Sequence, residues 1–484
     1  MSGSGAADLI LLGRVSAVGA THAPARAVAV CGERIAFVGS EHEALALRGP
    51  RTEVLGDRRA VIVAGFVDAH LHLVALARRV GEVDCSKDRA RSVRDVVATI
   101  REAAARLAPA SWIRAFGYDE FFLEEKRPPT VAELDAAAPG HAVRLLHRTG
   151  HAVVLNSLGF RRLGLTPREV IHEPAGLLKS KVAAIDGAEL TPLVREASRR
   201  LAAAGITTVH DPTPGRSMAD LVALRRWVDE GEIAQRVVAY GDPDSFAEPR
   251  ADSERFHLPG VKIMVTEASE AEALAAQVLA ADRAGRQVAL HAVEGGPLVL
   301  AIDALRRLGA ARVRERRHRI EHAALCPPAL CAEIAQSGAT IVTHPDFLRR
   351  FGEKYASELS EEEQAWLYPL RSLCLAAVPI ALGSDAPIAP PCPLANVQAA
   401  VERTSERGHR LAPSEAIGAA EAVALHTSGG AAAAKLDHLV GSVADGMLGD
   451  LVLLDADPTE VAPGEIASIG VQTTVIGGQV RWNR

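Results

Sequence analysis

The middle of this 484-residue chain alternates short apolar runs with longer Ala-, Leu- and Arg-rich stretches. Alternation of strands with helices is the pattern of βα units around a parallel sheet. Eight such units are what a closed (β/α)8 TIM-type barrel requires. The sequence therefore predicts an α/β fold with a TIM-type barrel, and its eight strands are expected at 61–67, 205–211, 236–240, 261–265, 287–291, 318–322, 340–344 and 379–385.

Three regions lie outside these eight units. Two strand-like runs, 112–116 and 142–146, fall between the first and second barrel strands, so we assign a long insertion at about 73–195. We expect this insertion to cover the barrel mouth. Strand and turn signals also fill both ends of the chain. Residues 1–63 and 436–484 are expected to form one small β-sandwich domain beside the barrel of 64–435, although two unrelated β flaps are an alternative.

Charge and composition exclude several classes of partner. The net charge is −6, from 60 acidic and 54 basic side chains, which leaves no electrostatic footprint for nucleic acid or an anionic membrane. No apolar run approaches the ~20 residues of a membrane helix. Six scattered cysteines form no disulfide framework in so large a chain. We expect a cytoplasmic enzyme with a small-molecule substrate, and a homodimer is the default expectation for an enzyme of this size.

Polar side chains gather at the ends of the predicted strands. His70 and His72 follow the first strand, and their spacing lets both imidazoles face one cation. In a TIM-type barrel the catalytic groups collect at the carboxyl ends of the strands. Four later strands carry such groups, namely Lys262, His291, His322 and Asp385. A single histidine at a strand end is usually structural, but six converging groups indicate a metal-dependent hydrolase.

Lys262 is the unusual member of this set. A zinc site needs about four ligands, and six groups exceed that number. The surplus is explained if carbon dioxide carboxylates Lys262, because a carboxylate could bridge two cations. A bare ammonium in the apolar run 260–265 would be costly. The alternative is a lysine that forms a salt bridge with Glu267 or Glu321.

Several motifs extend this pattern along nearly the whole chain: 65–72, Gly117-Tyr118-Asp119-Glu120, Gly150-His151, 205–211, 317–322 and Gly383-Ser384-Asp385. In combination they resemble the amidohydrolase superfamily, and within it the branch of N-substituted formamide deformylase-like enzymes (amidohydrolase family 3). The resemblance implies one or two zinc ions, with His70 and His72 on the more buried ion and His291 and His322 on the other. It also implies a bridging Lys262, and Asp385 as both metal ligand and catalytic proton carrier.

The resemblance also suggests where substrate binds. It makes Tyr118, His151 and His210 candidate substrate-binding residues, with a structural role as the alternative for each. After the seventh strand the branch commonly carries Gln-Pro, whereas this chain has His344-Pro345. We therefore expect His344 to face the substrate or to be structural.

These residues predict an amidohydrolase that hydrolyses an amide, formamide or cyclic amide C–N bond with metal-activated water. A rival hypothesis comes from Glu294, because His291-Ala292-Val293-Glu294 matches the His-x-x-Glu of zinc deaminases. In that case Glu294 would contact an amino-substituted heterocycle and shuttle a proton. Glu294 could instead cap the following helix or face solvent. A third hypothesis, a scaffold without metal, is disfavoured by the intact ligand set.

Overall fold

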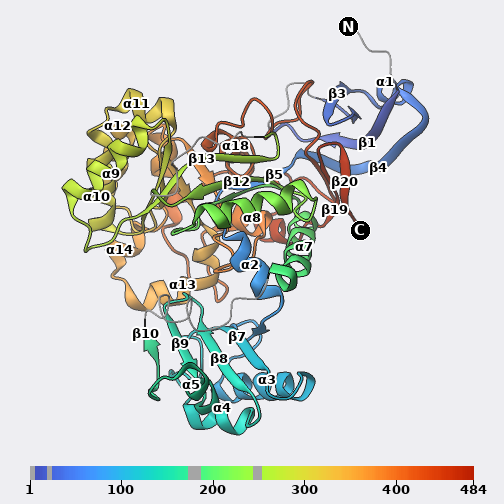
Figure 1. The fold of residues 1–484 in the computed structure, drawn as a ribbon. Coiled ribbons are helices and arrows are strands. Elements are labelled where there is room, and N and C mark those ends of the chain that lie inside the picture. The colour runs from blue at the N-terminus through green and yellow to red at the C-terminus, as the bar shows by residue number, and fades with distance from the viewer. Residues whose placement is uncertain (1–5, 19–23, 173–186, 244–252) are drawn as a thin grey trace. The chain divides into compact units, whose positions relative to one another are not determined.

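A computed structural model describes residues 6–18, 24–172, 187–243 and 253–484. The chain divides into two compact units, one made of residues 1–73 and 198–484 and the other of residues 74–197 (Figure 1). The first unit holds a barrel and a sheet built from both ends of the chain. The second holds the segment between the first two barrel strands.

The barrel is a sheet of eight parallel strands that pair with one another in chain order. The backbone N–H of Ala69 donates to Leu382 O at 3.1 Å, which joins the first strand to the last. The predicted TIM-type barrel is therefore confirmed. Its strands are β5 (Phe66–Asp68), β11 (Ile206–Asp211), β12 (Arg236–Gly241), β13 (Phe256–Met264), β14 (Gln287–Ala292), β15 (Arg319–His322), β16 (Thr340–Thr343) and β17 (Ile380–Leu382).

Helices follow most of the barrel strands, and local sequence explains where they begin. Ser217 caps α8, because its side chain accepts from Asp220 N while the Asp220 carboxylate accepts from Ser217 N. In Figure 1, helices α9, α10 and α12 lie side by side next to β14. The helices are α8 (Met218–Asp229), α9 (Ala271–Arg283), α10 (Gly295–Arg306), α11 (Ala310–Arg316), α12 (Pro328–Ser337), α13 (Asp346–Glu358), α14 (Glu361–Ala365), α15 (Leu370–Leu375), α16 (Pro393–Glu402), α17 (Ala419–Leu425) and α18 (Ser428–Ala433).

The two ends of the chain combine in one seven-stranded sheet, in the order β20-β19-β18-β4-β1-β2-β3. Alternate residues of its strands, such as Leu9, Leu11, Ile62 and Leu453, form a buried apolar cluster. Both ends therefore share one core, as the sequence predicts. The strands are β1 (Ala7–Val15), β2 (Ala27–Cys31), β3 (Arg34–Gly39), β4 (Arg48–Ala64), β18 (Leu451–Leu454), β19 (Val471–Ile476) and β20 (Gln479–Asn483), with helix α1 (Glu41–Ala46) between β3 and β4.

The first barrel strand differs from its predicted range of 61–67. Residues 61–64 end β4, where they pair with β18 of the terminal sheet, and β5 begins only at Phe66. Two strands of different sheets thus follow each other with Gly65 between them. Hydrophobicity alone could not separate them, because every residue from 60 to 71 is buried.

The second unit has a five-stranded sheet of its own, in the order β10-β9-β8-β7-β6. Helix α3 (Val93–Arg106) packs Val93, Val96 and Ile100 into its core. The two strands predicted in the insertion are found as β7 and β8, whereas its placement over the barrel mouth stays a prediction. The strands are β6 (Val83–Asp84), β7 (Trp112–Tyr118), β8 (Ala142–His147), β9 (Ala152–Leu155) and β10 (Ile171–His172), with helices α4 (Val131–Ala137) and α5 (Ser157–Leu163).

Helices α2 (Leu73–Val80) and α7 (Gly187–Ala203) lead the chain out of and back into the first unit. All six cysteines are free thiols. Within the described ranges, none of the helices is long and apolar enough to cross a bilayer.

Candidate metal centre

The barrel brings the histidines of its first strand against the aspartate that follows its last. Asp385 N donates to His70 O at 2.7 Å, and His72 N donates to Ala386 O at 2.7 Å. Gly383 makes this contact possible, since a Cβ there would lie 2.6 Å from His70 N. The backbone thus fixes His70, His72 and Asp385 beside one another before any ligand binds.

These three side chains form the first of two donor groups. Asp385 Oδ1 lies 3.2 Å from His72 Nε2 and 3.6 Å from His70 Nε2. One ligand atom from each residue falls within 4.8 Å of the other two. Two imidazole nitrogens and a carboxylate oxygen are a donor set that zinc accepts. The predicted ligands of the first ion are therefore brought together.

The second donor group consists of His70, His322 and His344, whose ligand atoms also lie within 4.8 Å of one another. The ring centre of His322 is 4.9 Å from that of His70 and 4.8 Å from that of His344. His291 joins through His322, because His291 Nδ1 is 3.0 Å from His322 Nε2. Four predicted residues thus meet, and His344, predicted as a substrate contact, lies among them.

Burial keeps these imidazoles neutral, which is the form that binds metal. Burial and the positive charge of Lys262 lower the pKa of His70 far below its usual value. Burial and Lys262 also lower the pKa of His291 to about 4. For His322 the pKa is lowered strongly by burial and by His344. At neutral pH each ring keeps a nitrogen lone pair for a cation.

Lys262 lies in β13 with 3% exposure. Its Nζ has no hydrogen-bond partner and no carboxylate within 4.0 Å in the described parts of the chain, so the alternative, a salt bridge with Glu267 or Glu321, is not formed. Burial lowers the pKa of Lys262 to about 8, against the raising effect of Glu321. The side chain therefore remains an unsatisfied amine inside the barrel.

The buried pair of Glu321 and Arg319 contacts the Nδ1 side of the His70 ring. Glu321 Oε2 is 2.6 Å from His70 Nδ1, and Arg319 Nη2 donates to the same oxygen at 2.9 Å. Burial would raise the pKa of Glu321, but the charges of Arg319 and Lys262 and the hydrogen bond from Arg319 together outweigh burial and lower it to about 2. A carboxylate that accepts from one ring nitrogen leaves the other nitrogen for metal. Glu321 is therefore a positioning residue for His70, a role that the sequence analysis missed.

The backbone at His322 explains why adjacent residues serve the same site. Regular strand alternation would turn Glu321 and His322 to opposite faces. His322 instead has φ 73°, in the left-handed region, and its ring approaches His70 just as Glu321 does. Asp385 has a similar φ of 54°. Non-glycine residues seldom adopt this conformation and often do so at functional sites.

The remaining predicted substrate residues are divided between the two units. His210 has 0% exposure, and its Nδ1 lies 3.0 Å from Arg319 Nη1, so it belongs to the buried network behind His70. Glu294 is exposed at the N-cap position of α10, where its side chain makes no capping hydrogen bond. Tyr118 and His151 belong to the second unit, where Tyr118 is buried and His151 is exposed. Their role at the barrel stays a prediction.

A third cluster, within the second unit, is an ion-pair group. His147 Nε2 lies 3.4 Å from Glu120 and 3.7 Å from Asp119. Thr149 N donates to His147 Nδ1 at 3.2 Å, which leaves the proton on Nε2. Arg148 donates to Asp119 at 3.1 Å. A protonated nitrogen cannot bind a cation, so this cluster does not form a metal site as it stands.

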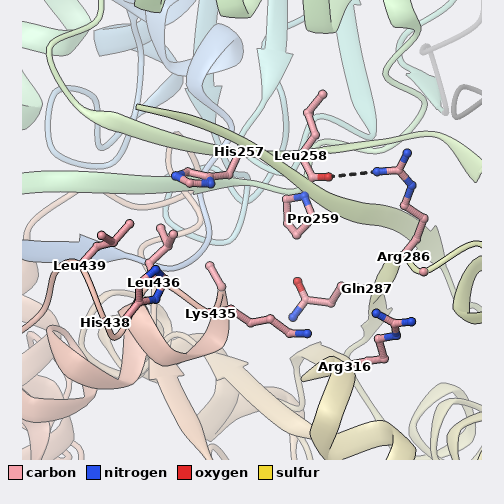
Figure 2. A pocket seen from close by; sticks show the side chains of 12 residues that line it. His257, Leu258, Pro259, Arg286, Gln287, Arg316, Lys435, Leu436, His438 and Leu439 are labelled. Atoms are coloured by element: carbon pink, nitrogen blue, oxygen red, sulfur yellow. Dashed lines mark hydrogen bonds between the residues drawn. The ribbon is translucent and has the colours of Figure 1, made fainter. Parts of the chain in front are cut away.

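A cavity of about 330 Å³ lies at the other end of the barrel strands (Figure 2). It is lined by the first residues of β13 and β14, including Pro259 and Gln287, and by cationic side chains such as Arg316 and Lys435. Active sites of TIM-type barrels lie at the carboxyl ends of the strands. None of the predicted site residues lines this cavity, and we assign no catalytic role to it.

Known proteins resemble this chain in sequence and in fold. The sequence pattern of the amidohydrolase family matches residues 60–481. The N-substituted formamide deformylase of Arthrobacter pascens is 27% identical over an alignment of 537 positions, gaps included, which covers 98% of each chain. An uncharacterized metal-dependent hydrolase from Pyrococcus horikoshii OT3 superposes with a TM-score of 0.77 and 21% identity, over 95% of this chain and 99% of that one. An adenosine deaminase from Xanthomonas campestris with bound zinc gives a TM-score of 0.58 and 16% identity, over 99% and 94%.

Proposed function

The chain belongs to the amidohydrolase family, and from this premise we propose that it is a metal-dependent hydrolase of a non-peptide C–N bond in a small molecule. The observation that carries the proposal is the donor group of His70, His72 and Asp385 at the end of the barrel. The similarity to a deformylase supports an N-substituted amide, formamide or cyclic amide as the substrate class.

We propose that these residues hold one or two divalent ions, most simply zinc. His70, His72 and Asp385 would bind the first ion, and His291 and His322 the second. A bound cation supplies an activated water and polarises the carbonyl group of the substrate. The neutral imidazoles and the unsatisfied atom Lys262 Nζ fit this assignment, because buried polar atoms in native proteins almost always have a partner.

Lys262 would bridge the two ions after carboxylation. Only the unprotonated amine attacks carbon dioxide, and a pKa of about 8 leaves a useful neutral fraction at physiological pH. The reaction would form an N–C bond at Nζ and release one proton from the neutral amine, or two in all when the ammonium is the starting form, and a carbamate anion would result. The nearby imidazoles then face a negative group in place of a positive one.

Asp385 is the proposed proton carrier. Burial raises the pKa of Asp385, but the interactions with His72, His344 and Lys262 outweigh burial and hold it below its usual value. The carboxylate is therefore ionised at neutral pH and can accept a proton. It would later deliver this proton to the leaving nitrogen, which departs as an amine.

A second candidate is deamination of an amino-substituted heterocycle. It is favoured by one observation, that Glu294 follows His291 by three residues and its carboxylate is not used in capping α10. In this reading Glu294 exchanges protons with the ring and the departing ammonia, and Lys262 has no part in the reaction.

The two candidates release different products. Purified protein loaded with zinc is incubated with N-substituted formamides, cyclic amides and aminoheterocycles, and formate, amine and ammonia are measured separately. We expect amine release that is lost in both Asp385→Asn and Lys262→Ala, with one metal equivalent lost in Lys262→Ala. Ammonia release that survives Lys262→Ala and disappears in Glu294→Gln would replace the first candidate by the second. The cytoplasmic location and the homodimer stay predictions.

A further inference from the structure

We propose that His344, at the end of the seventh barrel strand, is itself a metal ligand rather than a substrate contact. The inference rests on the proposed function only in assuming that a cation binds in this barrel. It adds a donor to the set that the resemblance implies, which is His70, His72, Lys262, His291, His322 and Asp385.

The hydrogen bonding of His344 prepares one nitrogen for a cation. His344 Nδ1 lies 2.9 Å from Gly383 O, and a carbonyl oxygen can only accept, so the proton sits on Nδ1. Nε2 is left with its lone pair. A ring nitrogen that donates to a backbone carbonyl while the other binds metal is the usual arrangement of metal-bound histidine.

His344 Nε2 has no partner within the described segments of the chain. The residue is 0% exposed, so water does not satisfy this nitrogen at the surface. A structural histidine in the same barrel shows the contrast: His426 places Nδ1 3.1 Å from Val67 O and Nε2 3.2 Å from Asn396 Nδ2. His426 thus uses both ring nitrogens, whereas His344 uses only Nδ1.

The neighbours of His344 are the predicted ligands. Its ring centre is 5.1 Å from that of His70 and 4.8 Å from that of His322, with one ligand atom of each residue within 4.8 Å of the others. His70 Nδ1 is occupied by Glu321, so Nε2, which also faces Asp385, is its available nitrogen, and His344 would bind the same ion as His70. Ligand nitrogens around a tetrahedral zinc lie ~3.3 Å apart for bonds of about 2.05 Å. The three ligand atoms, which lie within 4.8 Å of one another, therefore need to close by at most about 1.5 Å.

Local packing positions the ring for this role. Pro345 follows directly and occupies the N-cap position of α13. The ring of Phe347 lies 5.5 Å from that of His344 on the helix side. The ring of His344 is therefore packed against Phe347 as well as against the rings of His70 and His322.

Metal binding of the full-length protein tests the proposal directly. Zinc affinity is measured by competition with a chelator and metal content by mass spectrometry, for wild type, His344→Ala and His426→Asn. We expect His344→Ala to lose one metal equivalent or to bind zinc at least 10-fold more weakly. His426→Asn, an equally buried change outside the ligand set, should keep zinc affinity within about threefold. Unchanged affinity and content in His344→Ala would overturn the proposal.

A measurement on wild type keeps the proposal testable if His344→Ala does not fold. X-ray absorption and a structure of the zinc-loaded enzyme should place His344 Nε2 about 2.0–2.1 Å from the metal. A His344 ring beyond bonding distance of every ion overturns the inference. If His344→Ala binds zinc normally and still hydrolyses substrate, His344 is not a ligand, but the proposed function stands. If His344 binds zinc but the protein hydrolyses none of the substrates, the ligand assignment stands and the proposed function fails.

Discussion

Replacing Glu321 with glutamine removes the negative charge behind His70 and keeps the side-chain volume. Glu321 and Arg319 are both 0% exposed, and Oε2 of Glu321 is 2.6 Å from His70 Nδ1. Arg319 donates to the same oxygen at 2.9 Å. In Glu321→Gln the guanidinium stays buried without its carboxylate, and the imidazole loses a charged acceptor.

The expected losses follow from these contacts. Breaking a buried ion pair by removing one partner costs about 3–5 kcal/mol. Arg319 keeps two oxygen acceptors, Ala69 O at 2.6 Å and Tyr240 Oη at 3.1 Å, so we expect a loss near ~3 kcal/mol. Loss of a hydrogen bond to a ligand histidine lowers metal affinity by roughly 10–100-fold.

The assay separates stability from metal binding. Urea unfolding of the metal-free protein gives the free energy of unfolding, and competition of the folded protein with a chelator gives the metal affinity. Glu333→Gln is the matched control, because Glu333 pairs with Arg306 at 3.1 Å with both side chains 40% exposed. Such a surface pair contributes about 0–1 kcal/mol. If Glu321→Gln behaves like this control in both measurements, Glu321 does not position His70 and the reasoning is wrong.

Three further outcomes are expected. Asp385→Asn should keep the fold and lose activity by roughly 10²–10⁴-fold, since it removes the proton carrier; steady-state rates near wild type would contradict this. Gly383→Ala should lower both stability and metal content, because its Cβ would lie 2.6 Å from His70 N; thermal melting and metal analysis measure the two effects. Burial lowers the pKa of His318 to about 4, against the raising effect of Asp282. Between about pH 6.5 and 4 the imidazole is protonated in the unfolded chain but not in the native state. The free energy of unfolding should therefore fall by up to ~3 kcal/mol as pH drops through this range. His318→Gln should flatten this part of the pH–stability curve.

Much of this architecture could be predicted because each barrel unit carries its own local signals. Buried strands appear as apolar runs, and most of their polar residues stand at the carboxyl ends, as His322 and Asp385 do. A parallel barrel brings those ends together whatever lies between them in the chain. The candidate metal ligands could therefore be named without knowing any distance. The strand boundary at Gly65 could not be predicted from the sequence, because strands of two sheets follow each other there without a change in hydrophobicity.

The supporting residues were harder to predict because they depend on contacts between strands. Glu321 faces His70 across the barrel, and the sequence gives no sign that a carboxylate 251 residues away in the chain is its partner. His344 was expected to meet substrate because position alone cannot show that Gly383 O occupies its Nδ1. The left-handed backbone at His322 also breaks the alternation on which strand reading depends. Each of these facts comes from three-dimensional pairing rather than local pattern.

The pairing of β4 with β18 has a consequence for synthesis on the ribosome. Ala64 is hydrogen-bonded in register with Leu451, so the N-terminal strands emerge long before their partner is made. Contacts so distant in sequence form slowly, and an unpaired strand edge invites wrong partners in the meantime. Nascent chains stalled before residue 451 should therefore be much more dependent on chaperones than chains released after it.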